Sequence, residues 1–230
     1  MRISALIPCF NSEAYLAQAL DSAFGQSRPP DEVIVVDDGS TDCTAQVARD
    51  YPHAVRYVRQ EHAGIPAARN RAVSVARHDL VAFLDADDVW TEHSIADRLA
   101  VLESNPAAQG ASGLVEQFAS PELSVDARSR LAFTPGPSSA RVAGAMLLRR
   151  ELFESVGLFS TTFRVGETID WVARADAAGV VIQPVDRVVL RRRIHLNNTG
   201  RREAASRVDY LEVLKASLDR RRRPPTDGAA

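Results

Sequence analysis

The first hundred residues alternate between short apolar runs and segments whose apolar residues recur at helical spacing. The apolar runs predict strands at residues 3–8, 32–38, 55–58 and 80–88. Between and after them, the helical spacing predicts helices at residues 16–24, with Ser12 as a cap, and at 42–50, 67–76 and 91–103. Strands joined by crossover helices form a parallel sheet, so this pattern predicts an α/β fold.

Two of the predicted strands end in aspartates, in VVDDGSTD at residues 35–42 and in FLDADD at residues 83–88. Ligands collect at the carboxyl ends of parallel strands, and adjacent carboxylates cost free energy unless cations or hydrogen-bond donors meet them. Strand alternation would place Asp85 and Asp87 on one side of the sheet, with Asp88 adjacent. Their carboxylates favour a hard divalent ion, Mg²⁺ or Mn²⁺; the alternative is a solvated turn in which Asp88 caps the next helix.

The second half of the chain is less regular. It predicts further strands near 113–118 and 187–191, helices from 151 and at 168–178, and a Ser/Pro/Ala-rich loop at 119–141, followed by the apolar stretch ARVAGAMLL at 140–148. An apolar stripe in residues 201–222 predicts a C-terminal amphipathic helix, followed by a disordered tail at 223–230. That stripe favours docking on the chain's own sheet, with a weak homodimer as the alternative to a monomer.

Composition excludes several classes of protein. The net charge of −2 gives no broad attraction for nucleic acid, so we expect no nucleic-acid partner. Cys9 and Cys43 lack CxxC spacing, which argues against a disulfide framework or a zinc site. Apolar runs are too short to span a bilayer and no signal sequence is apparent, which predicts a cytoplasmic protein with no transmembrane segment.

Seven motifs, taken in order, resemble those of the inverting family 2 glycosyltransferases of the GT-A fold. They are IPCFN (7–11), VVDDGSTD, AGIPAARNRA (63–72), FLDADD, GAMLLRRELFESVGLF (144–159), GETIDWVARADAAG (166–179) and RRRIHLNNT (191–199). The resemblance implies a Rossmann-like, mixed and mainly parallel sheet flanked by helices. It also implies one domain over 1–200, with a nucleotide-binding half at 1–103 and an acceptor and catalytic half at 104–200.

The same resemblance implies a nucleotide diphosphate sugar as donor, with a UDP-sugar ranked first, and roles for individual residues. Asp38 would bind the base while Asp37 braces the loop. The implied donor-binding residues are Pro8, Phe10, Asn11, Asp38, Arg69, Asp85 and Arg193. Asp87 and His195 would hold Mn²⁺ or Mg²⁺ against the diphosphate.

One departure concerns the catalytic base. Many members of the family that the chain resembles carry Gly-Glu-Asp where this chain has Gly166, Glu167 and Thr168, and a threonine does not take up a proton at neutral pH. Three explanations remain open: Asp170 or Glu167 is the base, the acceptor is as acidic as a thiol, or the chain is a nucleotide-sugar-binding pseudoenzyme. We rank the first highest. The acceptor is not identified; it can be a saccharide, a peptide, a lipid or a small metabolite. Trp171 either stacks on it or, as is commoner in helices, lies in the core.

Overall fold

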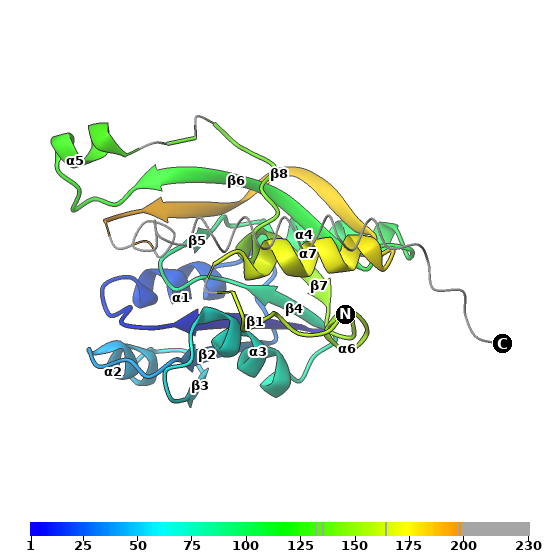
Figure 1. Cartoon of the computed structure of the whole chain (residues 1–230), viewed down its shortest axis with the longest axis horizontal. Coiled ribbons are helices and arrows are strands. Elements are labelled where there is room, and N and C mark those ends of the chain that lie inside the picture. The colour runs from blue at the N-terminus through cyan, green and yellow to red at the C-terminus, as the bar shows by residue number, and fades with distance from the viewer. Residues whose placement is uncertain (132, 135, 164, 197, 199–230) are drawn as a thin grey trace.

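The computed structural model describes residues 1–131, 133–134, 136–163, 165–196 and 198. Across these residues one sheet of eight strands is formed, in the order β3-β2-β1-β4-β7-β6-β8-β5. Figure 1 shows the sheet running through the whole molecule. This architecture confirms the predicted α/β fold with a mixed sheet flanked by helices.

The first four strands are parallel, as their spacing predicts. They are β1 (Ile3–Cys9), β2 (Glu32–Asp37), β3 (Val55–Arg59) and β4 (Leu80–Phe83), joined by α1 (Leu16–Phe24), α2 (Thr44–Arg49) and α3 (Ile65–Val75). Every residue of β1 is buried because helices cover both faces of the sheet. The continuous apolar run of β1 therefore follows directly from its central position.

Further strands of mixed direction extend this sheet beyond β4, and two of them, β6 and β8, are long. β7 (Met146–Arg149) is antiparallel to β4, β6 (Gly110–Ala119) is antiparallel to β7, and β8 (Ile182–Ile194) runs parallel to β6. β5 (Val89–Trp90) closes the far edge against β8. Sequence patterns underestimate β6 and β8, because glycines interrupt the first strand while Pro184 and Asp186 interrupt the second.

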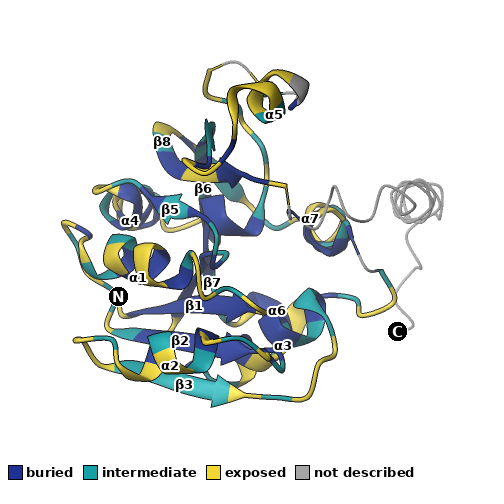
Figure 2. Ribbon diagram, turned by 90° about the vertical axis from the view of Figure 1, so that its left-hand side faces the viewer, coloured by how far each residue is buried: buried dark blue, intermediate teal, exposed yellow. Residues whose placement is uncertain are grey.

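Helices pack in a layer on each side of the sheet (Figure 2). One buried cluster joins the sheet to α1, α2 and α4 (Ser94–Ser104), and the other joins it to α3, α6 (Leu152–Ser155) and α7 (Glu167–Ala177). Trp171 of α7 is fully buried in the second cluster, so it belongs to the core. The predicted loop at 119–141 contains α5 (Val125–Arg130), and η1 (Ala143–Ala145) follows it.

Three local expectations are wrong. β4 ends at Phe83, and the next residues form a turn in which the Asp88 amide donates to the Asp85 carbonyl at 3.0 Å. Strand alternation therefore does not orient Asp85 and Asp87. Nor does Asp88 cap a helix, because its carboxylate accepts from the Arg193 amide at 2.8 Å. Ser12 does not cap α1 through its side chain either. Its backbone carbonyl, not its hydroxyl, accepts from the amide at the start of the helix.

Among the described residues, no helix combines the length and the apolar character needed to cross a bilayer. The predicted C-terminal helix and tail lie outside the described residues.

Candidate active site

The acidic motifs meet at one edge of the sheet. Because β1, β2, β4, β6 and β8 share one direction, their carboxyl ends open at the same edge. In Figure 1 the arrowheads of β1, β6 and β8 point to this edge, on the left. Segments far apart in the sequence are therefore brought together there, as is usual for ligand sites in open α/β sheets.

The paired aspartates at the end of β2 both brace the local backbone. Asp37 accepts from the Ser40 amide at 2.7 Å and from the Tyr57 hydroxyl. Burial alone raises the pKa of Asp37, but these hydrogen bonds and the nearby Arg59 charge outweigh it, so the net pKa is lowered. Asp37 thus holds the 37–40 turn, as the sequence interpretation has it.

Asp38 fixes the loop that precedes α3. Its Oδ1 accepts from the Gln60 side chain at 2.7 Å and the Ala63 amide at 3.0 Å, and its Oδ2 accepts from the Gly64 amide at 2.8 Å. His62 Nδ1 lies 2.8 Å from the same Oδ2. Both oxygens of the predicted base-binding carboxylate therefore already have donors within the chain.

An exposed aromatic pair stands beside this loop. Phe10, 42% exposed, stacks on the ring of His62 with centroids 4.1 Å apart. Asn11 has a left-handed φ of 49°, and its Oδ1 accepts from the Thr41 amide at 2.8 Å. Pro8 is buried within β1, so it supports this surface from behind. The sequence analysis did not select His62. The available signal was its position directly before the AGIPAARNRA motif.

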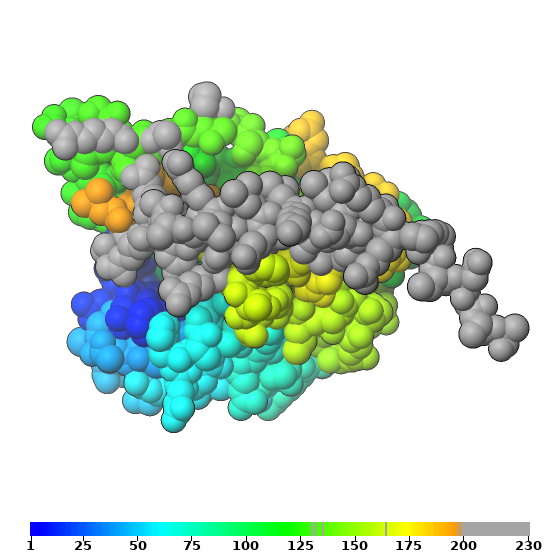
Figure 3. All heavy atoms as spheres, viewed as in Figure 1, coloured from blue at the N-terminus to red at the C-terminus, as the bar shows by residue number. Residues whose placement is uncertain are grey.

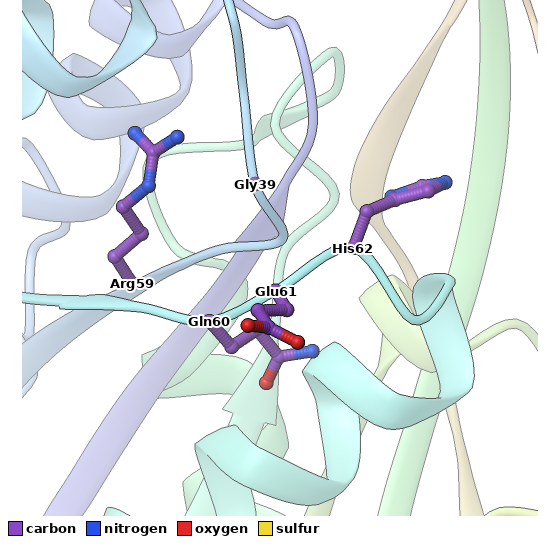
Figure 4. Close-up of a pocket in the computed structure, with 5 residues that line it drawn as sticks. All are labelled: Gly39, Arg59, Gln60, Glu61 and His62. Atoms are coloured by element: carbon purple, nitrogen blue, oxygen red, sulfur yellow. The ribbon is translucent and has the colours of Figure 1, made fainter.

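A shallow depression of about 490 Å³ adjoins the same loop. It is lined by Gly39, Arg59, Gln60, Glu61 and His62. Figure 4 shows the side chains of Arg59 and His62 extending to opposite sides of it. The stacked Phe10–His62 face and this depression together offer a surface for a planar, hydrogen-bonding ligand.

The aspartates after β4 differ in exposure and partners. The Asp85 and Asp87 side chains are 34% and 30% exposed, whereas Asp88 is buried. Asp87 Oδ2 lies 2.9 Å from His195 Nε2 and accepts from the Asn198 amide group at 3.3 Å. Asn198 also accepts from the His195 backbone amide at 2.7 Å, which holds the histidine in place. The predicted pair Asp87 and His195 is therefore assembled, with Asn198 as a supporting residue that the sequence reasoning did not single out.

Arg193 secures this turn from inside the protein. It is buried, its Nε donates to the Asp87 carbonyl at 2.8 Å, and its Nη2 donates to Gln18. Its guanidinium lies between the rings of Tyr15 and Phe118, at 5.0 and 4.6 Å from their centroids. The contacts of Arg193 are thus with the protein's own turn, and they orient the Asp87 backbone.

Asp88 is the one aspartate of this group that the fold withdraws from solvent. Burial raises the pKa of Asp88 well above its ordinary value, and the charges of Asp87 and Asp85 raise it further. The Arg193 backbone amide is its hydrogen-bond donor. Asp88 therefore links the turn to β8, and the carboxylates that face solvent are Asp85 and Asp87.

Arg69 connects the aspartates to the start of α7. The buried guanidinium donates through Nη2 to Asp85 Oδ1 at 2.7 Å and through Nη1 to Glu167 and to the Thr168 hydroxyl at 3.1 Å. Burial alone would lower the pKa of Arg69, but the Asp85 and Glu167 carboxylates raise it, so the arginine stays charged. Within the described residues its Nε has no hydrogen-bond partner.

The two candidate bases have different surroundings. Glu167 uses Oε1 for its contacts with Arg69 and Thr168, which place it beside Asp85. Asp170 Oδ2 accepts from Arg174 Nε at 2.9 Å, and Arg174 in turn donates to the carbonyls of Val156 and Leu158. Glu167 is thus linked through Arg69 to Asp85, whereas Asp170 is linked through Arg174 to the segment between α6 and α7.

The chemistry of the donor set fits a divalent cation of the Mg²⁺ or Mn²⁺ type. Two partly exposed carboxylates lie in the turn after β4, and the buried imidazole of His195, which follows β8, contacts one of them. The described residues contain no group of three His, Cys, Asp or Glu side chains placed to enclose a metal. Such ions are commonly held by one or two carboxylates together with ligand phosphates and water. An open arrangement of this kind is therefore compatible with a metal that binds along with a phosphate ligand.

Comparison with known proteins decides the family. Residues 4–157 match the model of the family described as Glycosyl transferase family 2. The chain belongs to glycosyl transferase family 2. This confirms the family resemblance seen in the motifs.

Relatives in the family are longer than this chain. An uncharacterized glycosyltransferase, alr2836 of Nostoc, is 30% identical over 68% of this chain and 53% of its own length. The succinoglycan biosynthesis protein ExoU of Rhizobium meliloti is 33% identical over 77% of this chain and 57% of its own. The chain therefore spans about half the length of these curated relatives.

Solved structures show the same fold. TarS 1–349 of S. aureus in complex with UDP-GlcNAc superposes with a TM-score of 0.77 at 21% identity, covering 96% of this chain and 66% of that one. The mannosyltransferase PcManGT of Pyrobaculum calidifontis, in complex with GDP-Man and Mn²⁺, gives a TM-score of 0.69 at 23% identity, covering 100% and 65%. At these identities the likeness concerns the fold, which is the GT-A fold expected from the motifs.

The family match ends at residue 157, before Glu167 and His195. Two contacts connect these later residues to the matched motifs, Arg69 with Glu167 and Asp87 with His195. The roles implied for the site residues remain predictions, and the geometry shows which of them lie together.

Proposed function

We propose that this chain is a metal-dependent, inverting glycosyltransferase that moves a sugar from a nucleotide diphosphate sugar to an acceptor. The observation that carries the proposal is the Asp85–Asp88 turn, where half-exposed carboxylates are linked through Arg69 to Glu167 and through Asp87 to His195. Family membership supports the reaction class.

The nucleotide would bind over the loops that follow β1 and β2. Phe10 and His62 offer a stacking face, and Asn11 and the 60–64 loop offer polar groups beside it. Both oxygens of Asp38 already accept hydrogen bonds within the chain. Asp38 would therefore either accept an additional hydrogen bond from the base or act by holding this loop. TarS binds UDP and UDP-GlcNAc and PcManGT binds GDP-Man, which supports a nucleotide donor here and leaves a UDP-sugar ranked first.

Asp87 and His195 would hold Mn²⁺ or Mg²⁺, with Asp85 beside them. A cation at this turn would stabilise the negative charge that develops on the departing diphosphate. The chain's own contribution is orientation: His195 and Asn198 fix the Asp87 carboxylate, and Arg193 fixes its backbone. The Mn²⁺ in the PcManGT complex supports this type of ion.

Glu167 is our candidate for the base. Within the described part of the chain, its Oε2 makes no hydrogen bond, while Arg69 holds Oε1. In the proposed step, an acceptor oxygen attacks the anomeric carbon on the face opposite the diphosphate, and Glu167 takes the acceptor's proton. The bond from that carbon to the diphosphate breaks and the nucleotide diphosphate leaves with the electron pair, so the configuration inverts.

A second candidate is a protein that binds nucleotide-sugars without transferring them. Thr168 favours it, because the motif resemblance implies an aspartate at this position, and the threonine hydroxyl contacts Arg69 and Glu167. Retained donor binding without release of the nucleotide diphosphate, even with a broad acceptor panel, would select this alternative.

The first test is a thermal-shift panel with UDP, UDP-GlcNAc, GDP and GDP-Man, each with and without Mn²⁺. A ligand at 100 times its Kd stabilises the folded state by about 2.7 kcal/mol, so donor binding raises Tm without knowledge of the acceptor. We expect a Mn²⁺-dependent shift for one nucleotide, lost in Asp87→Ala and retained in Asp186→Ala, a control at an exposed aspartate of β8. No shift with any nucleotide would overturn the proposed donor site.

A further inference from the structure

A second depression, of about 240 Å³, lies between α5 and the turn after β8. It is lined by Glu122, Leu123, Ser124, Ala127 and Leu196. Figure 3 shows the end of β8 (orange) against the segment that carries α5 (green). None of these five residues takes part in the donor site described above.

Contacts connect this depression to the reaction centre. Glu122 accepts from the Tyr15 hydroxyl, and the Tyr15 ring lies 4.8 Å from the ring of His195. His195 Nε2 is in turn 2.9 Å from Asp87 Oδ2. Two rings therefore separate Glu122 from the carboxylate proposed to hold the metal, and Leu196 directly follows the histidine.

The lining combines apolar surface with an ionised carboxylate. Leu196 is 63% exposed, whereas Leu123 is buried below it in a small cluster. Burial raises the pKa of Glu122, but hydrogen bonds from Ser120 and Tyr15 outweigh it and lower the pKa to about 2. Each carboxylate oxygen can accept more than one hydrogen bond, so Glu122 retains capacity for donors from a ligand.

We propose that this depression is an acceptor subsite for a single uncharged sugar ring. A pyranose has an apolar face that suits Leu196 and Leu123, and hydroxyl donors that suit Glu122. This inference rests on the proposed glycosyltransferase function and names the acceptor class as a saccharide.

The volume of the depression and the charge of Glu122 argue against a larger, an aliphatic or a phosphorylated ligand. Pockets for drug-sized ligands hold roughly 300–1,000 Å³, so a volume of about 240 Å³ suits one ring. An acyl chain would offer no further donor to the Glu122 carboxylate, which already accepts from Ser120 and Tyr15, and a phosphorylated group would meet its negative charge. Ser124, which caps α5 by accepting from the Ala127 amide at 3.1 Å, keeps this wall of the pocket in place.

The test is methyl NMR of the full chain, labelled at leucine and alanine methyl groups. Methyl β-D-glucopyranoside, methyl α-D-mannopyranoside and methyl N-acetyl-β-D-glucosaminide are titrated, with glucose 6-phosphate and 1-hexanol as charged and aliphatic comparisons. We expect at least one neutral glycoside to shift the Leu123, Ala127 and Leu196 signals saturably, and to bind more tightly than both comparison compounds.

Two variants make the result specific. Ala127→Phe fills the pocket and should weaken the glycoside by about tenfold or more. Val125→Phe, the same bulk on an 83% exposed position of α5 outside the pocket, should not. If Ala127→Phe fails to fold, Leu196→Ser replaces it, with Leu158→Ser as the control at another exposed leucine.

Three results would overturn the subsite: no glycoside shifts these methyl groups, glucose 6-phosphate or 1-hexanol binds as well as the best glycoside, or Ala127→Phe leaves the titration unchanged. The donor thermal shift is measured on the same sample. A donor shift without glycoside binding rejects the subsite alone, whereas an absent donor shift rejects the proposed function independently of the glycosides.

Discussion

At the scale of single residues, Arg69 has the most consequential position in the site. One guanidinium contacts Asp85, in the turn after β4, and Glu167, at the start of α7, which are 82 positions apart in the sequence. The family resemblance implies that Arg69 is a donor-binding residue. The structure shows that its contacts within the chain are with the carboxylates, because both are drawn toward the one buried cation between them.

Replacing Arg69 with methionine should lower the free energy of unfolding by about 3–5 kcal/mol, because Glu167 would remain buried without its cation. Urea denaturation measures the change. The matched control is Arg141→Met, which removes an exposed ion pair with Asp176 and should cost less than about 1 kcal/mol. Equal losses in the two variants would contradict a special role for the buried contacts.

Glu167 gives the sharpest catalytic prediction. Glu167→Gln should lower the rate of donor hydrolysis by about 10²–10⁴-fold through loss of proton transfer, while the donor thermal shift, taken from the variant's own ligand-free Tm, is retained. Loss of the Glu167 charge beside Arg69 should also lower that ligand-free Tm. Release of nucleotide diphosphate, followed by chromatography, measures the rate. Asp170→Asn is the comparison at the other candidate base: it should reduce stability through loss of the Arg174 contact and leave hydrolysis per folded molecule within a few-fold. The reverse ranking would move the base to Asp170.

Asp37 gives a pH prediction. Its folded-state pKa is lowered, so its stabilising contribution is present above the unfolded pKa of about 3.9 and is lost as the pH falls through the folded pKa. Asp37→Asn should therefore cost about 1.5–3 kcal/mol near pH 7 and progressively less below about pH 4. Denaturation midpoints over this range test the slope, with Asp186→Asn as an exposed control. A gap between wild type and Asp37→Asn that does not change with pH would rule out the carboxylate's charge as the cause.

At the scale of elements, the long β6–β8 pair decides where the late residues of the site lie. Its register shifts between Ser112 and Val115, and beyond the shift Phe118 pairs with Arg193. Gly113 lies in this irregular stretch, and a Cβ built on it would lie 2.4 Å from Val189 Cγ1 and 3.0 Å from the Arg187 carbonyl. The close approach of the two strands therefore requires glycine there.

Gly113→Ala should destabilise the protein by about 1–3 kcal/mol through overpacking. In a Val189→Ala background, which removes the two methyl groups that clash, the same change should cost clearly less. Chemical denaturation of the four proteins in this cycle gives the coupling. Purely additive losses would show that the contact with Val189 is not the cause.

At the scale of the whole molecule, the two halves inferred from the motifs share one core. β7 and β6 continue the sheet beyond β4, and each buried cluster contains residues from before and after position 104. The division into a nucleotide-binding half and an acceptor half therefore does not correspond to separate cores. It remains a prediction about where the two ligands bind.

A fragment ending at residue 103 should not fold cooperatively, because it would leave the edge of β4 unpaired and one side of both clusters open. The complete chain should unfold in a single transition of its described core. Calorimetry and circular dichroism of both proteins make the comparison. A cooperative transition in the fragment would mean that the first half is an independent domain.

How far the sequence predicts this protein differs between its two halves. Strands and helices up to about residue 83 follow from local patterns, because β1, β2 and β4 are nearly continuous apolar runs that are buried in the sheet, and only the edge strand β3 is partly exposed. Beyond residue 83, polar and proline residues in β8 and glycines in β6 interrupt the apolar pattern of two long strands. The pairing partners of these strands are distant in sequence. Local patterning carries no information about such pairing.

The sequence by itself determined the alternation of strands and helices, the acidic strand ends and the motifs that place the chain in its family. Only the tertiary structure decided which carboxylate meets which partner: Asp85 with Arg69 and Glu167, Asp87 with His195, and Asp88 with the backbone of β8. The reason is physical. Apolar periodicity is a local property of the chain, whereas the pairing of buried charges depends on side chains that only packing brings within a few ångströms of one another.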